Sequence, residues 1–227
     1  MPAAGVIAVR VEAVLFDLDG TLIDSAPDLA GAANDLRIAR GQAPMPYQTL
    51  RPMVGAGARG MVGLAFGKAP GDSDYDELRA AFLARYAERM LHATRVFDDV
   101  VPVLAALDEA RIPWGIVTNK ALHLAEPIVA GLGLAARAAV LIGGDSTPHA
   151  KPHPAPLIEA TRRIGASAGR CVYVGDDARD IQAGRAAGMA VLAAAWGYLG
   201  QGAPVEAWGA DEVMHRPDAL LNWLGLP

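Results

Sequence analysis

Residues 11–21, VEAVLFDLDGT, constrain the fold of this chain more than any other stretch. The first six residues are mostly apolar, with β-branched and aromatic side chains, and this pattern predicts a buried β-strand. Asp17 and Asp19 follow at once, and their side chains should lie on the same side because side chains alternate along an extended chain. Two neighbouring carboxylates repel each other unless a cation or a shared proton offsets their charge. The strand end therefore predicts a site for Mg²⁺, a proton or both; a solvated turn with capping acids is the alternative for these residues alone.

Strand and helix patterns alternate over the second part of the chain. The strands are predicted at residues 112–119, 139–144, 170–174, 189–195 and 211–214, and the helices at residues 98–111, 120–132, 154–164, 181–187 and 217–224. Repeated strand–helix units predict a parallel sheet with helices on both faces. We therefore expect an α/β fold with a doubly wound, Rossmann-like parallel sheet.

Residues 23–94 interrupt this alternation. Residues 24–28, DSAPD, have capping side chains and an early proline and predict the start of a helix that runs to about residue 40. Helical spacing returns over residues 47–66, broken by three glycines, and over residues 75–91, with no convincing strand pattern. We expect a core domain of residues 9–22 and 95–227 and an all-helical insert, as long as a small domain, at residues 23–94.

Polar residues gather at or just beyond the ends of the predicted strands. They are Asp17 with Asp19, Thr118 with Asn119, Lys151, and Asp176 with Asp177 and Asp180. Since the carboxyl ends of parallel strands share one edge of the sheet, we expect these side chains to converge. The set holds a nucleophile, ligands for phosphoryl oxygens and carboxylates for a hard cation. Taken singly, the second pair could cap a helix, the lysine could lie in a surface loop, and the last acids could form a turn and an N-cap.

The order of these residues resembles the four motifs of the haloacid dehalogenase-like phosphatases. The first motif, Asp-x-Asp-Gly-Thr after an apolar strand, is matched in full at residues 17–21, and the fourth, Gly-Asp-x-x-x-Asp, at residues 175–180. Thr118 stands where the second motif has Ser or Thr, and Lys151 before Pro152 where the third has its lysine. The resemblance covers nearly the whole chain after about residue 9.

This resemblance implies a phosphatase that forms an aspartyl-phosphate. Asp17 would attack phosphorus, and Asp19 would protonate the leaving oxygen and then deprotonate water. Thr118, the Asn119 backbone N–H and Lys151 would hold the phosphoryl oxygens. Dehalogenases and phosphonatases of the same superfamily lack an acid at the position of Asp19, so its presence favours a phosphatase or a mutase.

The resemblance also implies a Mg²⁺ cofactor. The ion would be held by the Asp17 carboxylate, the Asp19 backbone carbonyl and Asp176, with Asp177 or Asp180 in support. Few carboxylates, completed by waters and a phosphate oxygen, are typical of a magnesium site.

The helical insert resembles the cap domain that closes over the site in this family and reads the leaving group. Its most site-like loop is residues 51–60, RPMVGAGARG, because glycines allow close approach and Arg51 and Arg59 could bind an anion of the substrate. A helix–helix turn with solvated arginines is the alternative. Gly-x-Gly in this loop is typical of phosphoglycolate phosphatases, which favours 2-phosphoglycolate as the substrate.

Other stretches of the sequence are compatible with a different substrate or a different activity. Residues 113–120, 125–128 and 195–198 resemble the N-acetylmuramic acid 6-phosphate phosphatases of cell-wall recycling equally well, so that substrate is the first alternative. A sugar-phosphate mutase and a non-catalytic phospho-switch similar to a receiver domain are further alternatives; the helical insert argues against the receiver. Trp196 and Tyr198 follow a predicted strand and either line the site entrance or pack in the core.

The net charge and the cysteine content indicate which partners and which cell compartment to expect. The 227 residues carry a net charge of −5, which gives no support for nucleic acid or an anionic membrane as a partner. We expect a small phosphorylated metabolite instead, bound by a monomer or a homodimer. The single cysteine, Cys171, excludes a disulfide framework and fits a reducing compartment. Residues 1–10 make a poor signal peptide, and no stretch is apolar for long enough to span a bilayer, so we expect a cytoplasmic protein.

Overall fold

The computed structural model describes residues 11–227, so the expectations for the first ten residues, including a core domain that starts at residue 9, lie outside the described part. Its main element is a six-stranded parallel sheet in the order β5-β4-β1-β6-β7-β8. The strands are β1 (Ala13–Phe16), β4 (Trp114–Val117), β5 (Leu141–Ile142), β6 (Cys171–Gly175), β7 (Ala190–Ala194) and β8 (Glu212–Met214). The predicted doubly wound parallel sheet is confirmed, and β1, which leads to the first two acids, lies inside it.

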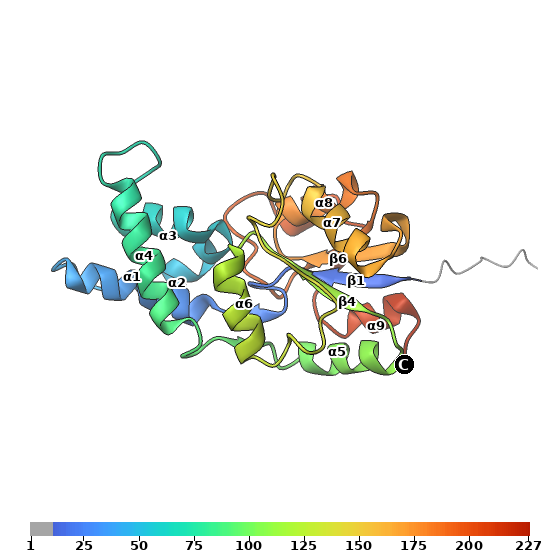
Figure 1. Cartoon of the computed structure of the whole chain (residues 1–227). Helices are drawn as coiled ribbons and strands as arrows, with labels where there is room; N and C mark the ends of the chain where they lie inside the picture. Colours follow the sequence, from blue (N-terminus) through green and yellow to red (C-terminus); the bar gives the residue numbers. More distant parts are fainter. Residues whose placement is uncertain (1–10) are drawn as a thin grey trace, which may run out of the picture.

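Helices cover both faces of this sheet (Figure 1). One face carries α5 (Val100–Glu109), α6 (Leu122–Gly131) and α9 (Ala219–Leu224); the other carries α7 (Ala155–Ile164) and α8 (Ala178–Ala186), and two short 3₁₀ helices, η2 (Ala168–Arg170) and η3 (Val205–Ala207), complete the connections. The residues of β1 show the division, because Val14 and Phe16 join the core with the first group of helices. Ala13 and Leu15, which alternate with them, join the core with the second group. A strand that is apolar at every position is thus buried on both sides.

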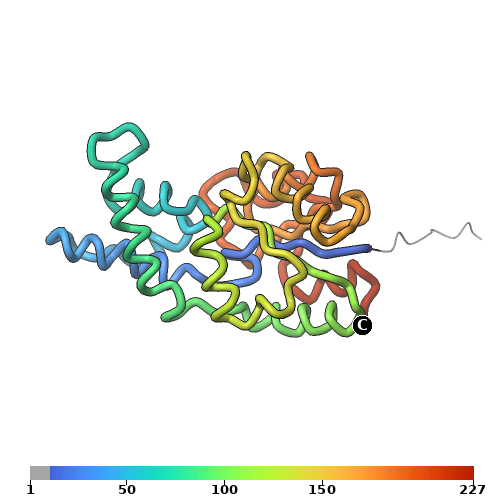
Figure 2. Tube along the Cα trace, viewed as in Figure 1, coloured from blue at the N-terminus to red at the C-terminus, as the bar shows by residue number. Residues whose placement is uncertain are grey.

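The helical insert forms a lobe at the end of the sheet toward which β1 runs (Figures 1 and 2). It contains α1 (Ala26–Ala39), α2 (Tyr47–Leu50), the 3₁₀ helix η1 (Arg51–Ala56), α3 (Gly57–Phe66) and α4 (Tyr75–Arg89). Helix α1 lies against both α3 and α4. Leu29, Phe82 and Tyr86 of these helices are buried in the same core as Val14 and Phe16 of the sheet. The lobe and one face of the sheet therefore share one continuous apolar core.

A two-stranded ribbon connects the lobe to the sheet. Ile23–Asp24 (β2) pairs antiparallel with Arg95–Val96 (β3), so the prediction that no strand lies between residues 21 and 94 is wrong at this place. Two residues are too few for a period-two pattern to be detected in a sequence. The ribbon lies next to the expected domain boundaries at residues 22/23 and 94/95, which stay a prediction. No helix within residues 11–227 has the length and apolar composition that crossing a membrane requires.

Candidate active site

The carboxyl ends of β1, β4 and β6 bring the predicted site residues together. These three strands are neighbours and parallel, so the residues that follow them meet at one edge of the sheet. A cavity of about 470 Å³ opens there between the sheet and the helical lobe. The predicted residues that line it are Asp17, Asp19, Thr118, Asn119, Lys151, Asp176, Asp177, Asp180 and Arg59.

Lys151 is the central cation of the site. Its side chain is almost fully buried, and its Nζ lies 2.9 Å from Asp17 Oδ1 and 2.8 Å from Asp180 Oδ1. The same nitrogen donates hydrogen bonds to the Val117 carbonyl, at 2.9 Å, and to the Tyr173 hydroxyl, at 2.7 Å. Burial disfavours the charge on Lys151, but the two carboxylates outweigh burial and raise its pKa above the usual value. Lys151 therefore stays positive beside the carboxylate that is the predicted nucleophile.

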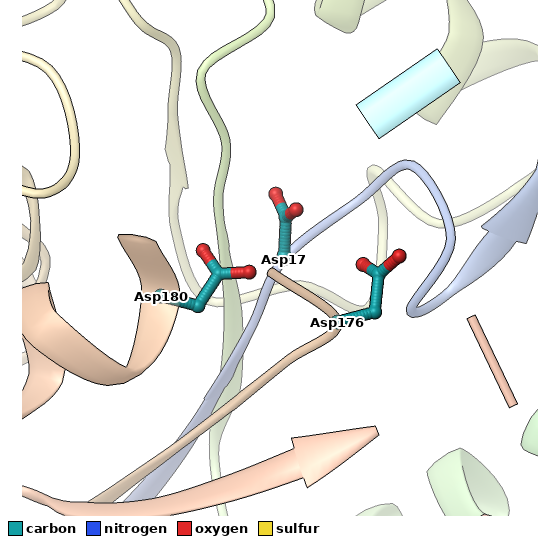
Figure 3. A group of neighbouring side chains, drawn as sticks. All are labelled: Asp17, Asp176 and Asp180. Carbon is teal, nitrogen blue, oxygen red and sulfur yellow. The ribbon is translucent and has the colours of Figure 1, made fainter. Parts of the chain in front are cut away.

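The carboxylates of Asp17, Asp176 and Asp180 form a cluster, which Figure 3 shows. One oxygen from each of Asp17, Asp176 and Asp180 lies within 4.8 Å of the others. Burial, followed by repulsion from the other two acids, raises the pKa of Asp176 well above its usual value. Burial likewise raises the pKa of Asp17 to about 6, although Lys151 opposes the rise. Such a cluster is stable in its charged form only if a cation compensates it.

The donor set fits a hard divalent cation. All three groups are carboxylates, which Mg²⁺ prefers. Among the described residues, no hydrogen-bond donor is aligned with the buried Asp17 Oδ1, which lies beside Lys151 as an ion pair only. Asp176 is fixed in place, since Thr21 Oγ1 donates to its Oδ1 and the Tyr198 backbone N–H to its Oδ2, both at 2.8 Å. The residues present are therefore suited to hold Mg²⁺.

The acids of the fourth motif have separate positions. Asp180 belongs to the carboxylate cluster and also forms a capping box with Asp177 at the start of α8. Asp177 accepts hydrogen bonds from the backbone and the side chain of Arg179 instead, and these bonds outweigh burial and lower its pKa. The structure thus brings Asp180 rather than Asp177 to the possible metal site. That the Asp19 backbone carbonyl is also a ligand of Mg²⁺ stays a prediction.

Asp19 is held by two side chains at the border of the lobe. Lys120 Nζ lies 3.1 Å from Asp19 Oδ2, and Ser25 Oγ donates a hydrogen bond to Asp19 Oδ1. Lys120 also donates to the hydroxyl of Tyr86 on α4, at 3.0 Å. Burial opposes its charge, but Asp19 and Tyr86 raise the pKa of Lys120 above the usual value. Sequence reasoning missed Lys120, although its place directly after the second motif was a signal.

Thr118 and Asn119 support the same edge. Thr118 is buried, and its Oγ1 accepts a hydrogen bond from the Lys120 backbone N–H at 3.1 Å. The side chain of Asn119 pairs with the backbone of Lys151 in both directions, at 2.9 Å each. Asn119 therefore positions the loop that carries Lys151, a function of its side chain that the sequence did not suggest.

The two arginines expected to bind the substrate lie in different surroundings. Arg59 lines the cavity from α3, whereas Arg51 is not among the lining residues and its guanidinium lies 5.1 Å over the Tyr198 ring. Arg79 of α4 lines the cavity as well and was missed, because a helical surface arginine has no distinguishing pattern in the sequence. Within residues 11–227, neither Arg59 nor Arg79 forms an ion pair, whereas Lys120, Lys151 and Arg179 of the core all do.

Comparison with known proteins identifies the family. The sequence model of the haloacid dehalogenase-like hydrolases matches residues 11–188, which include all four clusters of polar residues. The chain belongs to the haloacid dehalogenase-like hydrolases. The matched residues include Asp17, Lys151 and the other two acids of the carboxylate cluster, Asp176 and Asp180.

Curated relatives carry two different names. A phosphoglycolate phosphatase of Xanthomonas campestris pv. campestris is 47% identical over 209 residues, which are 92% of this chain and 94% of that protein. An N-acetylmuramic acid 6-phosphate phosphatase of Pseudomonas aeruginosa is 40% identical over 215 residues, 95% of each chain. Among solved structures, a protein from Haemophilus somnus described as a predicted phosphoglycolate phosphatase superposes with a TM-score of 0.82 at 27% identity, over 94% of this chain and 98% of that one. This hydrolase thus resembles both kinds of phosphatase over nearly its full length.

Proposed function

We propose that the chain is a Mg²⁺-dependent phosphatase of a small phosphomonoester, with 2-phosphoglycolate as the first candidate substrate. The observation that carries the proposal is the position of Asp17. Its carboxylate lines a cavity, beside a buried lysine and two further carboxylates, and Arg59 and Arg79 of the lobe line the same cavity. The 47% identical phosphoglycolate phosphatase supports the choice of substrate.

In the first half of the reaction, an oxygen of Asp17 attacks phosphorus. The new bond joins this oxygen to phosphorus, and the bond from phosphorus to the substrate's ester oxygen breaks. Asp19, which lines the same cavity, gives its proton to the departing oxygen, so an alcohol leaves. Lys151 and Thr118 hold the phosphoryl oxygens during the transfer.

In the second half, water attacks the phosphorus of the aspartyl-phosphate. Asp19, now a carboxylate, takes a proton from this water. The bond between phosphorus and Asp17 breaks, which releases inorganic phosphate and restores the starting state of both acids. The two steps together consume one water molecule for each ester bond.

Asp17, Asp176 and Asp180 would hold Mg²⁺. When bound, the ion supplies positive charge that lets an anionic carboxylate approach an anionic phosphate. We therefore expect a chelator to reduce phosphate release below about 1% of the original rate, and added Mg²⁺ to restore it, since removal of the cation leaves the carboxylates uncompensated. The steady-state rate before and after treatment with EDTA is the measurement. Full activity after exhaustive chelation would refute the metal's part in the reaction.

The free arginines of the lobe point to a second negative charge on the substrate. Glycolate carries a carboxylate, and Arg59 and Arg79 are the cavity cations without an acidic partner in the described part of the chain. A guanidinium can hold such a carboxylate by paired hydrogen bonds.

Arg79→Gln is therefore expected to raise KM for 2-phosphoglycolate about 10-fold, because it removes a charged hydrogen bond. KM for ethyl phosphate, which lacks the carboxylate, should change less than about 2-fold. Arg85→Gln is the matched control, since Arg85 lies on the same helix, is exposed and pairs with Glu88. Equal changes in KM for both esters would argue against a carboxylate subsite.

N-acetylmuramic acid 6-phosphate is the second candidate substrate, and the size of the cavity favours it. About 470 Å³ is ample for a sugar phosphate, and Leu29, Val54 and Phe82 line the cavity with apolar surface. This compound also carries a carboxylate, and the 40% identical relative is named for it. Phosphate release with Mg²⁺ from 2-phosphoglycolate, N-acetylmuramic acid 6-phosphate and neutral sugar phosphates separates the candidates by kcat/KM. Slow release from every compound would contradict the proposed function.

The same proposal includes the location and the partner. The single cysteine supports a reducing compartment, and we place the enzyme in the cytoplasm. Because the net charge is −5, a small phosphorylated metabolite would be bound by local cations and not attracted by the overall field.

A further inference from the structure

Tyr198 has no assigned part in the reaction, yet it contacts three parts of the site. It follows β7 in the sequence Trp196-Gly197-Tyr198 and is only 4% exposed. It does not line the catalytic cavity. Its contacts reach the carboxylate cluster, the ribbon that leads into the lobe, and the lobe itself.

The hydroxyl of Tyr198 caps helix α1. It accepts hydrogen bonds from the backbone N–H of Ser25, at 2.8 Å, and of Ala26, at 3.0 Å, and it donates to Asp24 Oδ1 at 3.2 Å. Asp24 Oδ1 shares the Ala26 N–H at 3.3 Å. The first N–H groups of a helix have no partner inside the helix, and here they are buried. The Tyr198 side chain, which follows a strand of the sheet, therefore accepts hydrogen bonds from the N–H groups of Ser25 and Ala26 at the start of α1.

This arrangement frees the side chain of Ser25. A serine at the N-cap position usually accepts a hydrogen bond from the second or third N–H of its helix. Ser25 occupies the N-cap of α1 but its side chain makes no such bond, so of the predicted capping side chains Asp24, and not Ser25, accepts an N–H of this turn. One reason is Pro27, which has no N–H to offer. Ser25 Oγ instead donates to Asp19 Oδ1.

The backbone of Tyr198 is fixed to the carboxylate cluster. Its N–H donates to Asp176 Oδ2 at 2.8 Å. Gly197 must be glycine for this approach, since a Cβ there would lie 2.2 Å from Asp176 Cβ. On the other side, Arg51 of η1 packs on the Tyr198 ring. The tyrosine is thus held at its backbone by the core and contacts the lobe with its ring and hydroxyl.

We infer that Tyr198 is a positioning residue: by capping α1 it holds Ser25 in the orientation in which Oγ directs Asp19 toward the leaving oxygen. The inference rests on the proposed function, in which Asp19 is the acid. In this arrangement Arg51 supports the ring of Tyr198 and does not contact the substrate. Tyr198 itself touches no reacting atom.

The test uses two esters that differ in their need for an acid. Glycolate leaves as an alkoxide unless it is protonated, whereas p-nitrophenolate departs readily without a proton. The quantity to measure is kcat/KM, because it depends only on the steps up to and including release of the leaving group. Tyr198→Phe should lower kcat/KM for 2-phosphoglycolate at least about 10-fold, because a general acid contributes about 10²–10⁴-fold when aligned. For p-nitrophenyl phosphate the loss should stay below about 3-fold.

Ser25→Ala provides a second route if the tyrosine variant fails to fold. It keeps the two backbone N–H groups that donate to Tyr198. It removes the contact to Asp19 and the weaker one, at 3.4 Å, between Ser25 Oγ and the Tyr198 hydroxyl, so it should show the same difference between the esters. Because both residues act through one contact, the double variant should lose little more than either single variant. Tyr75→Phe is the control, since Tyr75 is a buried tyrosine of α4 outside the cavity.

Two results would overturn the inference. Equal losses on both esters would mean that Tyr198 only stabilises the fold, and unchanged kcat/KM on both would mean that it does not position Asp19. Inactivity of the unaltered enzyme on both esters would overturn the proposed function first. Measuring that enzyme at the outset therefore keeps the two failures apart.

Discussion

Replacing Asp17 by Asn is expected to lower kcat at least about 10⁴-fold, the size of loss seen when a covalent nucleophile is removed. The amide oxygen cannot attack phosphorus, whereas the shape of the side chain is kept. Asp17 Oδ1 lies 2.9 Å from Lys151 Nζ, so the substitution also removes the negative partner of a buried lysine. Phosphate release under saturating substrate is the measurement, with a circular dichroism spectrum to show that the fold is unchanged.

Asp177→Asn is the matched control for this experiment. Asp177 is next to the cluster in sequence but pairs with Arg179 and caps α8. We expect the control to keep kcat within about 10-fold, because Asn is about as good an N-cap residue as Asp. A variant Asp17→Asn with the activity of the unaltered enzyme would exclude Asp17 as the nucleophile.

Replacing Lys151 by Met is expected to have the largest effect on stability and to lower activity as well. The Lys151 side chain is 2% exposed and lies within 2.9 Å of two carboxylates, so its removal leaves buried negative charge uncompensated. Breaking a buried ion pair in this way costs about 3–5 kcal/mol. We expect this loss in the free energy of unfolding in EDTA, measured by urea denaturation, and a fall in kcat of about 10³-fold, as when one preorganised charge is removed.

Mg²⁺ should restore part of the stability of this variant, because a cation that binds only the folded state stabilises it. Lys68→Met is the control, since Lys68 pairs with Asp74 at the surface, where solvent screens the charges and such pairs contribute little to stability. An unfolding free energy in EDTA equal to that of the unaltered protein would show that Lys151 does not compensate the cluster.

The sheet and the edge that carries chemistry could be predicted because their signals are local. Apolar runs that end in polar residues mark β1, β4 and β6, and a parallel sheet necessarily brings their ends together. The convergence of Asp17, Thr118 and Asp176 follows from that geometry, whereas Lys151 lies beyond β5 and was predicted from its place in the third motif. The short β2–β3 ribbon could not be predicted, since its pairing joins residues far apart in the sequence.

The contacts that the sequence could not predict cross the border between the sheet and the lobe. Lys120 reaches Asp19 and Tyr86, and Tyr198 reaches Ser25, through contacts between segments up to 173 residues apart. Arg51 was predicted to bind the substrate and Arg79 was not, because which of them faces the cavity depends on how η1 and α4 pack. The pattern of motifs therefore locates the reaction, whereas the choice of substrate and the support of Asp19 depend on tertiary contacts.

The most direct test of the account is to trap phosphate on Asp17. The variant Asp19→Asn, which cannot activate water, is mixed with p-nitrophenyl phosphate and Mg²⁺, quenched in acid within one turnover, and digested with pepsin for mass spectrometry. The account predicts one phosphoryl group on the peptide that contains Asp17, and none when Asp17→Asn is added to the variant. Release of p-nitrophenolate with phosphate on another residue, or on no residue, would contradict it.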